Sequence, residues 1–157
     1  MDRSRSGAGS VVPVNDHPAA SPGTSYPGQR LGLPEEGPGS VAGWGRRLLA
    51  LTVDWVAATF VTIGLIGAAR WSGDPLSGWT TMLVFLVEAG ILTALMGGSF
   101  GQLLCRVTVV RLDGVPVNLL QAFLRTFLIC LVIPPLVFNQ DGRGLHDLAV
   151  NTATLRR

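Results

Sequence analysis

The sequence contains no lysine, and all twelve of its basic residues are arginine. Basic clusters with interleaved aromatic residues are missing too, so we expect no nucleic-acid partner. Charged residues make up only 14% of the chain, whereas ordinary soluble domains carry about 25%. Together with a mean hydropathy of +0.43, this low charge predicts a membrane protein of single-domain length.

Cysteine and histidine are also scarce. Cys105 lies at a predicted helix edge and Cys130 inside an apolar run, so we expect no structural disulfide. His146 has only Asp141 and Asp147 near it, which are too few ligands at no standard metal spacing. The sequence also lacks a recognisable set of side chains for nucleophilic catalysis. We therefore expect no metal, no cofactor and no enzymatic activity.

The first thirty residues hold no apolar h-region, so we expect no cleavable signal peptide. Residues 1–40 are rich in proline, glycine and serine, and they cannot bury enough apolar surface to offset their ordering entropy. This composition predicts a disordered cytoplasmic tail, with a docking peptide around Tyr26 and Pro27 as the alternative. Residues 41–157 would then form the membrane domain.

The longest apolar stretch predicts a first transmembrane helix at about 46–69. Residues 48–69 carry one ionisable side chain, Asp54, and would span roughly 33 Å, enough to cross a hydrocarbon core of about 30 Å. A carboxylate at that depth costs about 2.5–3.5 kcal/mol, so it should face protein or water. A helical stripe of small and polar residues contains it and predicts the packing face: Ala50, Asp54, Ala58 and Thr62.

A second apolar stretch predicts another full transmembrane helix at about 79–98. Its single charge is Glu88, and Gly90, Ala94 and Gly98 follow at four-residue steps, as in the packing faces of membrane helices. Two buried carboxylates would be costly without partners. Either the acids are protonated, or an arginine pairs with one of them.

The third apolar segment, about 118–138, is broken. It contains Arg125 and is interrupted by Pro134 and Pro135, so it reads as a re-entrant segment or as a crossing. The re-entrant arrangement is favoured because it keeps the later arginines on the cytoplasmic side with the N-terminal tail. The C-terminus is then cytoplasmic as well.

Between the second and third segments, the valine-rich residues 103–111 alternate loosely and predict a short β-like element. Asp113 and Gly114 supply a turn, and residues 151–156 are a candidate pairing partner. Arg106 and Arg111 make this element positive, which places it in the cytoplasm. The predicted fold class is an all-α membrane bundle with this element beneath it.

The chain resembles the RDD family of small integral membrane proteins over about 43–157. The family is named after one arginine and two aspartates, which match Arg47 and Asp54 in residues 43–54 and Asp147 in residues 143–149. Gly101 and the Leu124–Arg125 pair also match the pattern. Gln102 stands where a lysine is common, Arg106 where a glycine is, and residues 150–151 where Ala-Gly is usual. For this family, transport is the usual suggestion.

Arg47 and Asp54 lie two helical turns apart, about 10.5 Å along the axis, which is too far for a direct ion pair. We therefore expect Asp54 to pair with Arg125. That pair either fixes the helix register or, with Glu88, belongs to a proton or cation relay. Asp147 is expected in a cap over the helix ends, bonded to backbone or to Arg47.

These patterns lead to two functional hypotheses for a multi-pass protein of the plasma membrane. The first is a non-enzymatic accessory or scaffold subunit whose buried charges set helix packing and partner choice. The second is an oligomeric ion or proton transporter that uses Asp54 and Glu88. Two or three helices cannot enclose a pathway alone, so the expected partners are membrane lipids and either further copies of the chain or a larger membrane protein.

Overall fold

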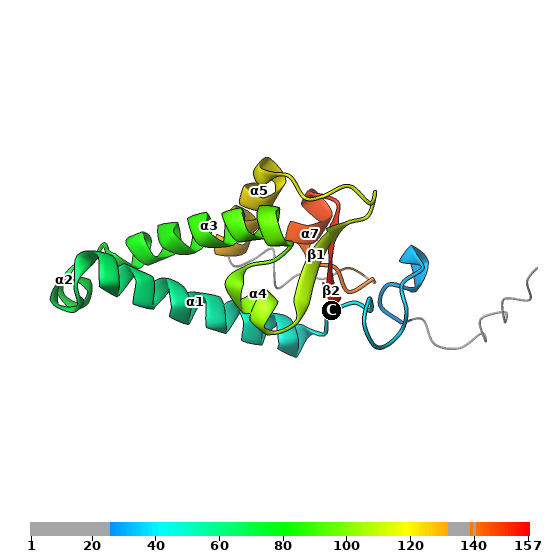
Figure 1. The fold of residues 1–157 in the computed structure, drawn as a ribbon, viewed down its shortest axis with the longest axis horizontal. Helices are drawn as coiled ribbons and strands as arrows, with labels where there is room; N and C mark the ends of the chain where they lie inside the picture. The colour runs from blue at the N-terminus through cyan, green and yellow to red at the C-terminus, as the bar shows by residue number, and fades with distance from the viewer. Residues whose placement is uncertain (1–25, 132–138, 140) are drawn as a thin grey trace, which may run out of the picture.

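The computed structural model describes residues 26–131, 139 and 141–157. Two long helices lie side by side and are joined at one end by a short helix, while the strands and the C-terminal helix gather at the other end (Figure 1). The described elements are η1 (Gln29–Leu31), α1 (Trp44–Ile66), α2 (Ala68–Gly73), α3 (Ser77–Met96), α4 (Phe100–Leu104), β1 (Val107–Arg111), α5 (Leu119–Cys130), α7 (Leu145–Ala149) and β2 (Thr152–Arg156).

The two long helices, α1 and α3, are long and apolar enough to span a membrane. Their ends differ by two or three residues from the predicted 46–69 and 79–98. Gly67 (φ 85°) ends α1 and Gly97 (φ 75°) ends α3, because neither backbone conformation continues a right-handed helix. Residues 68–73, the first two of which belong to the predicted first span, form the separate helix α2.

The inner face of α1 is small and polar, and its outer face is large and apolar. The predicted stripe is confirmed, since the buried residues of α1 are Ala50, Asp54, Ala58 and Thr62. Phe60, by contrast, is 70% exposed. A helix of a water-soluble protein has its apolar residues inside and its polar residues outside. The reverse distribution in α1 fits an outer face that contacts lipid.

Helix α3 packs on both α1 and α5. Phe85 and Ala89 meet Ala58 of α1 in a small apolar core. On the side of α5, a Cβ at Gly90 would stand 2.9 Å from the ring of Phe123. Gly90 therefore lets the two helices approach closely, as the small-residue pattern predicts.

Helix α5 is also polar inside and apolar outside. Asn118 and Gln121 form a capping box that starts it, and its buried residues are Ala122, Arg125 and Thr126. Leu120 on the outer face is 77% exposed. With twelve residues, α5 is about 18 Å long, well short of a full crossing. The remainder of the predicted third segment, 132–138, lies outside the described residues.

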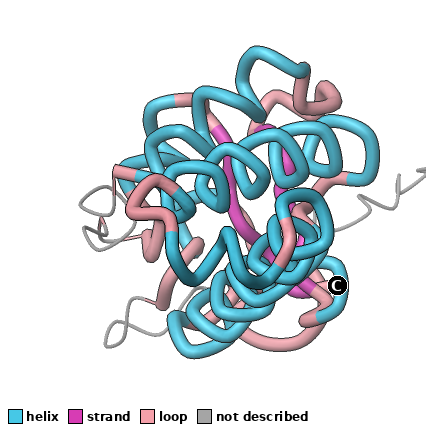
Figure 2. Tube along the Cα trace, turned by 90° about the vertical axis from the view of Figure 1, so that its left-hand side faces the viewer, coloured by secondary structure: helices cyan, strands magenta, loops and turns pink. Residues whose placement is uncertain are grey.

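The predicted β-like element is a two-stranded antiparallel sheet. β1 pairs with β2 so that Val107 lies opposite Arg156 and Arg111 opposite Thr152. These strands fall within the predicted 103–111 and 151–156, but residues 100–104 form the helix α4. Seen along the long helices, the sheet lies behind them and closes one end of the bundle (Figure 2).

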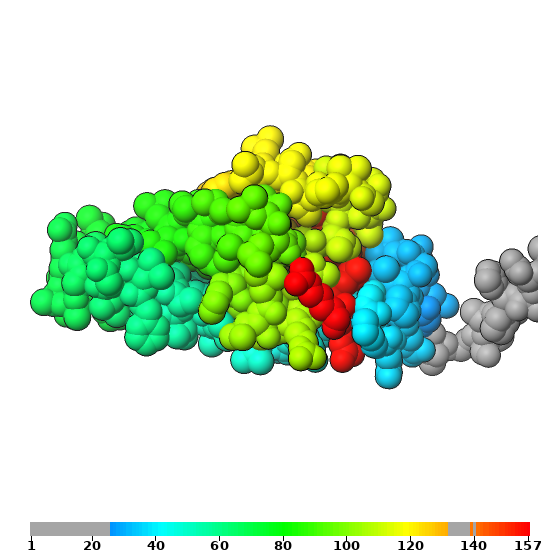
Figure 3. Space-filling model, viewed as in Figure 1, coloured from blue at the N-terminus to red at the C-terminus, as the bar shows by residue number. Residues whose placement is uncertain are grey.

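The segment before α1 extends the sheet. Gly39 and Ala42 donate backbone hydrogen bonds to Arg156 and Thr154, and Val41 forms a bridge with Leu155. In the space-filling view this segment lies against the C-terminal strand (Figure 3). Residues 26–40, placed in the disordered tail by composition, thus contain η1 and hydrogen bonds to β2, because that strand has a free edge to accept them.

Candidate functional site

Asp54 is bound by the first turn of α4. Its side chain is 2% exposed, and Oδ2 accepts a hydrogen bond of 2.6 Å from the Ser99 hydroxyl. Oδ1 accepts one of 2.5 Å from the backbone N–H of Gly101. Ser99 is the N-cap of α4 and forms a capping box with Gln102. The carboxylate therefore lies where a helix presents unpaired N–H groups and positive potential.

Glu88 reaches the same helix start from the other long helix. Its Oε1 accepts a hydrogen bond of 3.1 Å from the backbone N–H of Phe100. Asp54 of α1 and Glu88 of α3 thus bind neighbouring amides of α4. The sequence suggested protonation or an arginine partner for these acids, whereas α4 offers backbone donors to both. These backbone donors were not expected because part of residues 100–104 was predicted as strand, whereas they fold as a helix.

Gly101 makes this contact possible. A Cβ there would stand 2.1 Å from the carbonyl oxygen of Ala50 and 2.9 Å from Cγ of Asp54. Such distances leave no room for a side chain, so α4 can approach α1 only with glycine at this position. The match of Gly101 to the RDD pattern therefore has a steric reason.

Asp147 forms the centre of a second charge cluster. It is 0% exposed, and its Oδ1 lies 2.8 Å from Nε of Arg125. Thr154 donates to Oδ2 over 2.7 Å and Thr152 to Oδ1 over 3.1 Å. Arg47 approaches Oδ2 to 3.9 Å, in agreement with the expected contact between Asp147 and Arg47.

The expected pair of Asp54 with Arg125 is replaced by the pair of Arg125 with Asp147. This is a correction to the interpretation of the sequence. Helix α7 follows the third apolar segment and packs on α5 and β2, so it brings Asp147 against the inner face of α5. Asp54 meanwhile receives its donors from α4, and the two acids have different partners.

Thr152 and Thr154 were missed from the sequence as members of this cluster, and they also accept hydrogen bonds from its arginines. Arg143 donates from Nε to the carbonyl of Thr152 over 2.9 Å and from Nη2 to the carbonyl of Asp147 over 3.4 Å. Arg47 donates from Nε to Ala42 over 2.8 Å and from Nη2 to Thr154 over 3.3 Å. One signal was available, since Thr152 and Thr154 lie two residues apart and share one face of a strand.

The carboxylate of Asp147 is held ionised by its neighbours. Complete burial acts to raise its pKa, but the positive charges of Arg125, His146 and Arg47 act in the opposite direction and prevail. The pKa of Asp147 is therefore well below its usual range. Arg47 and Arg125 lie at this single carboxylate and Arg143 binds the main-chain carbonyl of the same residue, so the cluster carries more positive than negative charge.

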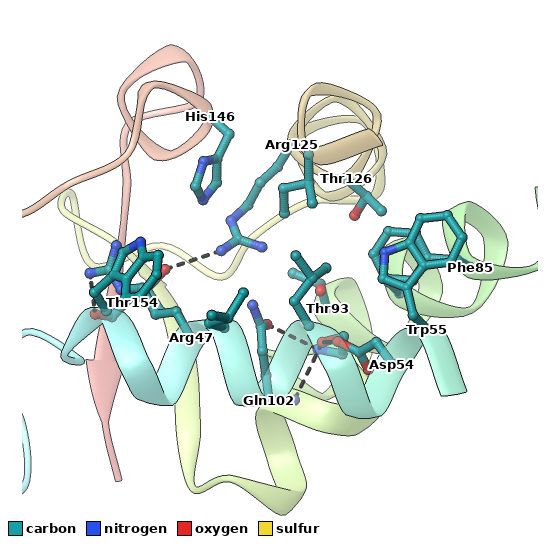
Figure 4. A pocket seen from close by; sticks show the side chains of 16 residues that line it. Arg47, Asp54, Trp55, Phe85, Thr93, Gln102, Arg125, Thr126, His146 and Thr154 are labelled. Carbon is teal, nitrogen blue, oxygen red and sulfur yellow. Dashed lines mark hydrogen bonds between the residues drawn. The ribbon is translucent and has the colours of Figure 1, made fainter. Parts of the chain in front are cut away.

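A cavity of about 250 Å³ lies between α1, α3 and α5 and touches both clusters. At one end it meets Arg47, Arg125 and His146, and at the other it meets the stacked rings of Trp55 and Phe85 (Figure 4). The lining residues are Trp44, Arg47, Leu48, Leu51, Asp54, Trp55, Phe85, Ala89, Thr93, Ser99, Gln102, Arg125, Thr126, Ile129, His146 and Thr154.

The structure thus divides the predicted charged residues between two clusters. Arg47, Arg125 and Asp147 are together, whereas Asp54 and Glu88 meet at α4. Within the described ranges, His, Cys, Asp and Glu side chains form no group that could hold a metal ion. Cys105 and Cys130 are both free thiols.

The two apolar helices and the charges turned inward define the class: a helical membrane protein with a polar interior and an apolar exterior. The RDD family model matches residues 41–151, and the chain belongs to the RDD family. Comparisons with curated proteins and with solved structures gave no significant match.

Proposed function

We propose that this RDD protein is a non-enzymatic accessory or scaffold subunit of the plasma membrane, whose buried charges fix helix packing. The observation that carries the proposal is that the buried acids bind groups of their own chain. Asp54 and Glu88 bind amides of α4, and Asp147 binds Arg125 and two threonines. Carboxylates held this way join one segment of the fold to another.

The arrangement of elements supports a topology with both ends of the described chain on the cytoplasmic side. The sheet, the start of α1 and α7 lie together at the end remote from α2 (Figure 1). If α1 and α3 cross the bilayer, α2 is outside, and α5, which is too short for a full crossing, enters from the cytoplasmic side. Arginines at the sheet end, among them Arg46 and Arg106, then obey the positive-inside tendency.

The outer surface supports a role in assembly. Large apolar side chains cover the exposed faces of the helices that would lie in the bilayer, including Phe60, Leu65 and Leu95. Such a surface suits lipid or another membrane helix. Two spanning helices and the short α5 do not surround a pathway, so a functional unit would contain further copies or a larger partner.

An oligomeric ion or proton transporter is the second candidate. It is favoured by one observation: Asp54 lines the cavity between the helices. In an oligomer this carboxylate could exchange a proton or cation with the cavity, and Glu88 binds the neighbouring amide of α4.

The substitution Asp54→Asn separates the two candidates, with Asp74→Asn between α2 and α3 as the matched control. For a scaffold, Asp54→Asn lowers abundance and shifts the mass of the intact complex in mild detergent, while Asp74→Asn changes neither. For a transporter, the complex keeps its mass and cation-dependent pH changes in proteoliposomes disappear. Unchanged assembly together with lost flux would therefore reject the scaffold proposal.

A further inference from the structure

We propose that the cavity between α1, α3 and α5 binds the headgroup of an anionic phospholipid. The phosphate would lie at the end formed by Arg47 and Arg125, and the acyl chains would leave along Trp55 and Leu48. This inference needs a chain embedded in a membrane, and it does not depend on the accessory role proposed above.

The first argument is charge. Arg47 and Arg125 share one carboxylate, that of Asp147, and Arg143 binds the main-chain carbonyl of Asp147 in the same buried cluster. Excess positive charge away from water is costly unless an anion compensates it. Arg125 is 2% exposed and lines the cavity, and its bonds to Asp147 and Thr154 within the described chain use Nε and Nη2. A guanidinium group in this setting suits a phosphate oxygen.

Asp54 also lines the cavity and would repel an anion. Its two oxygens, however, accept hydrogen bonds from Ser99 and Gly101, so the start of α4 offsets its charge. The arginine end therefore remains the attractive end for a negatively charged group.

A second observation, independent of charge, also points to a ligand. Thr93 lines the cavity and is 1% exposed, and its hydroxyl has no hydrogen-bond partner among the described residues. A buried hydroxyl without a partner costs about 1–3 kcal/mol. An ester or glycerol oxygen of a lipid in the cavity would satisfy it.

The apolar end favours a lipid over a free phosphate ion. Leu51, Phe85 and Ile129 line the cavity, and Leu48 and Trp55, which also line it, are exposed on the outer side of α1. The cavity is thus continuous with the surface that faces acyl chains. Its 250 Å³ is room for about eight waters, which suits a phosphate and glycerol but not a whole lipid.

The depth of the charged end also fits a headgroup. Arg47 lies in the first turn of α1, within about 6 Å of the helix start. Trp44 begins the same helix, and tryptophan is enriched at the membrane interface. The arginine end would therefore lie near the phosphate layer and the aromatic end within the hydrocarbon.

The test is native mass spectrometry and thermal unfolding of the full chain in mild detergent with phosphatidylglycerol, phosphatidylcholine or inorganic phosphate added. We expect phosphatidylglycerol to bind at least tenfold more tightly than phosphatidylcholine and to raise the unfolding temperature. Inorganic phosphate alone should have no comparable effect. Equal binding of both lipids would overturn the proposal, and equal stabilisation by phosphate would assign the site to a free anion.

Two variants locate the site. Thr93→Val should weaken phosphatidylglycerol binding about fivefold, the loss of one hydrogen bond, with Thr80→Val on the same helix as control. Ile129→Trp should fill the apolar end and weaken binding at least tenfold, with Leu120→Trp on the outer face of α5 as control. If Ile129→Trp fails to fold, the comparison of Thr93→Val with Thr80→Val tests the site by itself. Binding unchanged by Thr93→Val would reject the cavity as the site, whatever the assembly assay shows.

Discussion

The two charge clusters of this protein stabilise buried carboxylates with different kinds of hydrogen-bond donor. At α4, the acids Asp54 and Glu88 bind neutral backbone amides at the start of a short helix. At the sheet, Asp147 binds the charged side chain of Arg125 and two threonine hydroxyls. The first cluster leaves its acids without a direct arginine partner among the described residues, and the second has surplus positive charge. A buried acid in a membrane protein therefore does not by itself predict a basic partner.

The sheet cluster should be the more sensitive of the two. Asp147→Asn removes the negative charge and leaves Arg125 buried beside other arginines, so we expect a loss of about 3–5 kcal/mol in the free energy of unfolding. Chemical unfolding in mixed micelles measures this loss in the free energy of unfolding. Asp113→Asn is the matched control, because the pair of Asp113 with Arg111 is screened by solvent at the surface and should contribute little to stability. Equal effects of the two substitutions would contradict the assigned central role of Asp147.

The α4 cluster depends on close approach more than on charge. Gly101→Ala places a methyl group 2.1 Å from the Ala50 carbonyl, so α4 must move away and both acids lose their donors. We expect a cost of about 3 kcal/mol, the upper range for overpacking. Gly64→Ala in α1 meets nothing within 4 Å and should leave the unfolding temperature unchanged or slightly higher. A tolerated Gly101→Ala would show that α4 does not lie against α1 as described.

Within the α4 cluster, the two acids should differ. Asp54→Asn weakens two hydrogen bonds at a buried site, and we expect a loss of about 2 kcal/mol. Glu88→Gln weakens one bond at a half-buried site and should cost under about 1 kcal/mol. The same unfolding assay compares the free energies lost by the two substitutions. The reverse order would mean that Glu88 has an additional partner in the assembled protein.

The smallest expected effect concerns the two positions at which this chain departs from the glycines of the family pattern. Arg106 and Asn151 both adopt φ 54°, in the left-handed region. Arg106→Gly should raise the free energy of unfolding by up to about 1 kcal/mol, because the strain of a side chain there exceeds the entropy cost of glycine. Asn151→Gly should change it less, since asparagine tolerates this conformation. A destabilised Arg106→Gly would indicate that the arginine side chain itself stabilises the fold.

Much of the fold could be read from the pattern of residues along the chain. The stripe from Ala50 to Thr62 identified the packing face of α1 because helical periodicity is local and lipid leaves small and polar residues only the inner face. The loose alternation in 103–111 predicted a short strand, and β1 does pair with β2, which lies in the candidate partner 151–156. Helix ends were less accurate, since glycine at positions 67 and 97 stops each helix by a backbone conformation that composition does not reveal.

The partners of the buried charges could not be read in the same way. Arg125 and Asp147 lie on different elements, 22 residues apart in the chain, and only the packing of α7 on α5 brings them together. Asp54 and Glu88 both accept hydrogen bonds from backbone amides, which no side-chain pattern marks, and Asp54 also accepts one from the Ser99 hydroxyl. The cavity arises from the spacing of three helices, and no stretch of sequence contains it.

The sequence by itself determined that this chain belongs in a membrane, which helix faces turn inward and that it is an RDD protein, because hydropathy, periodicity and motif are properties of local sequence. The tertiary structure alone decided which donor meets each buried acid and where positive charge remains in excess. Electrostatic partnership depends on distances of a few ångströms between elements remote in the chain, and those distances exist only after folding.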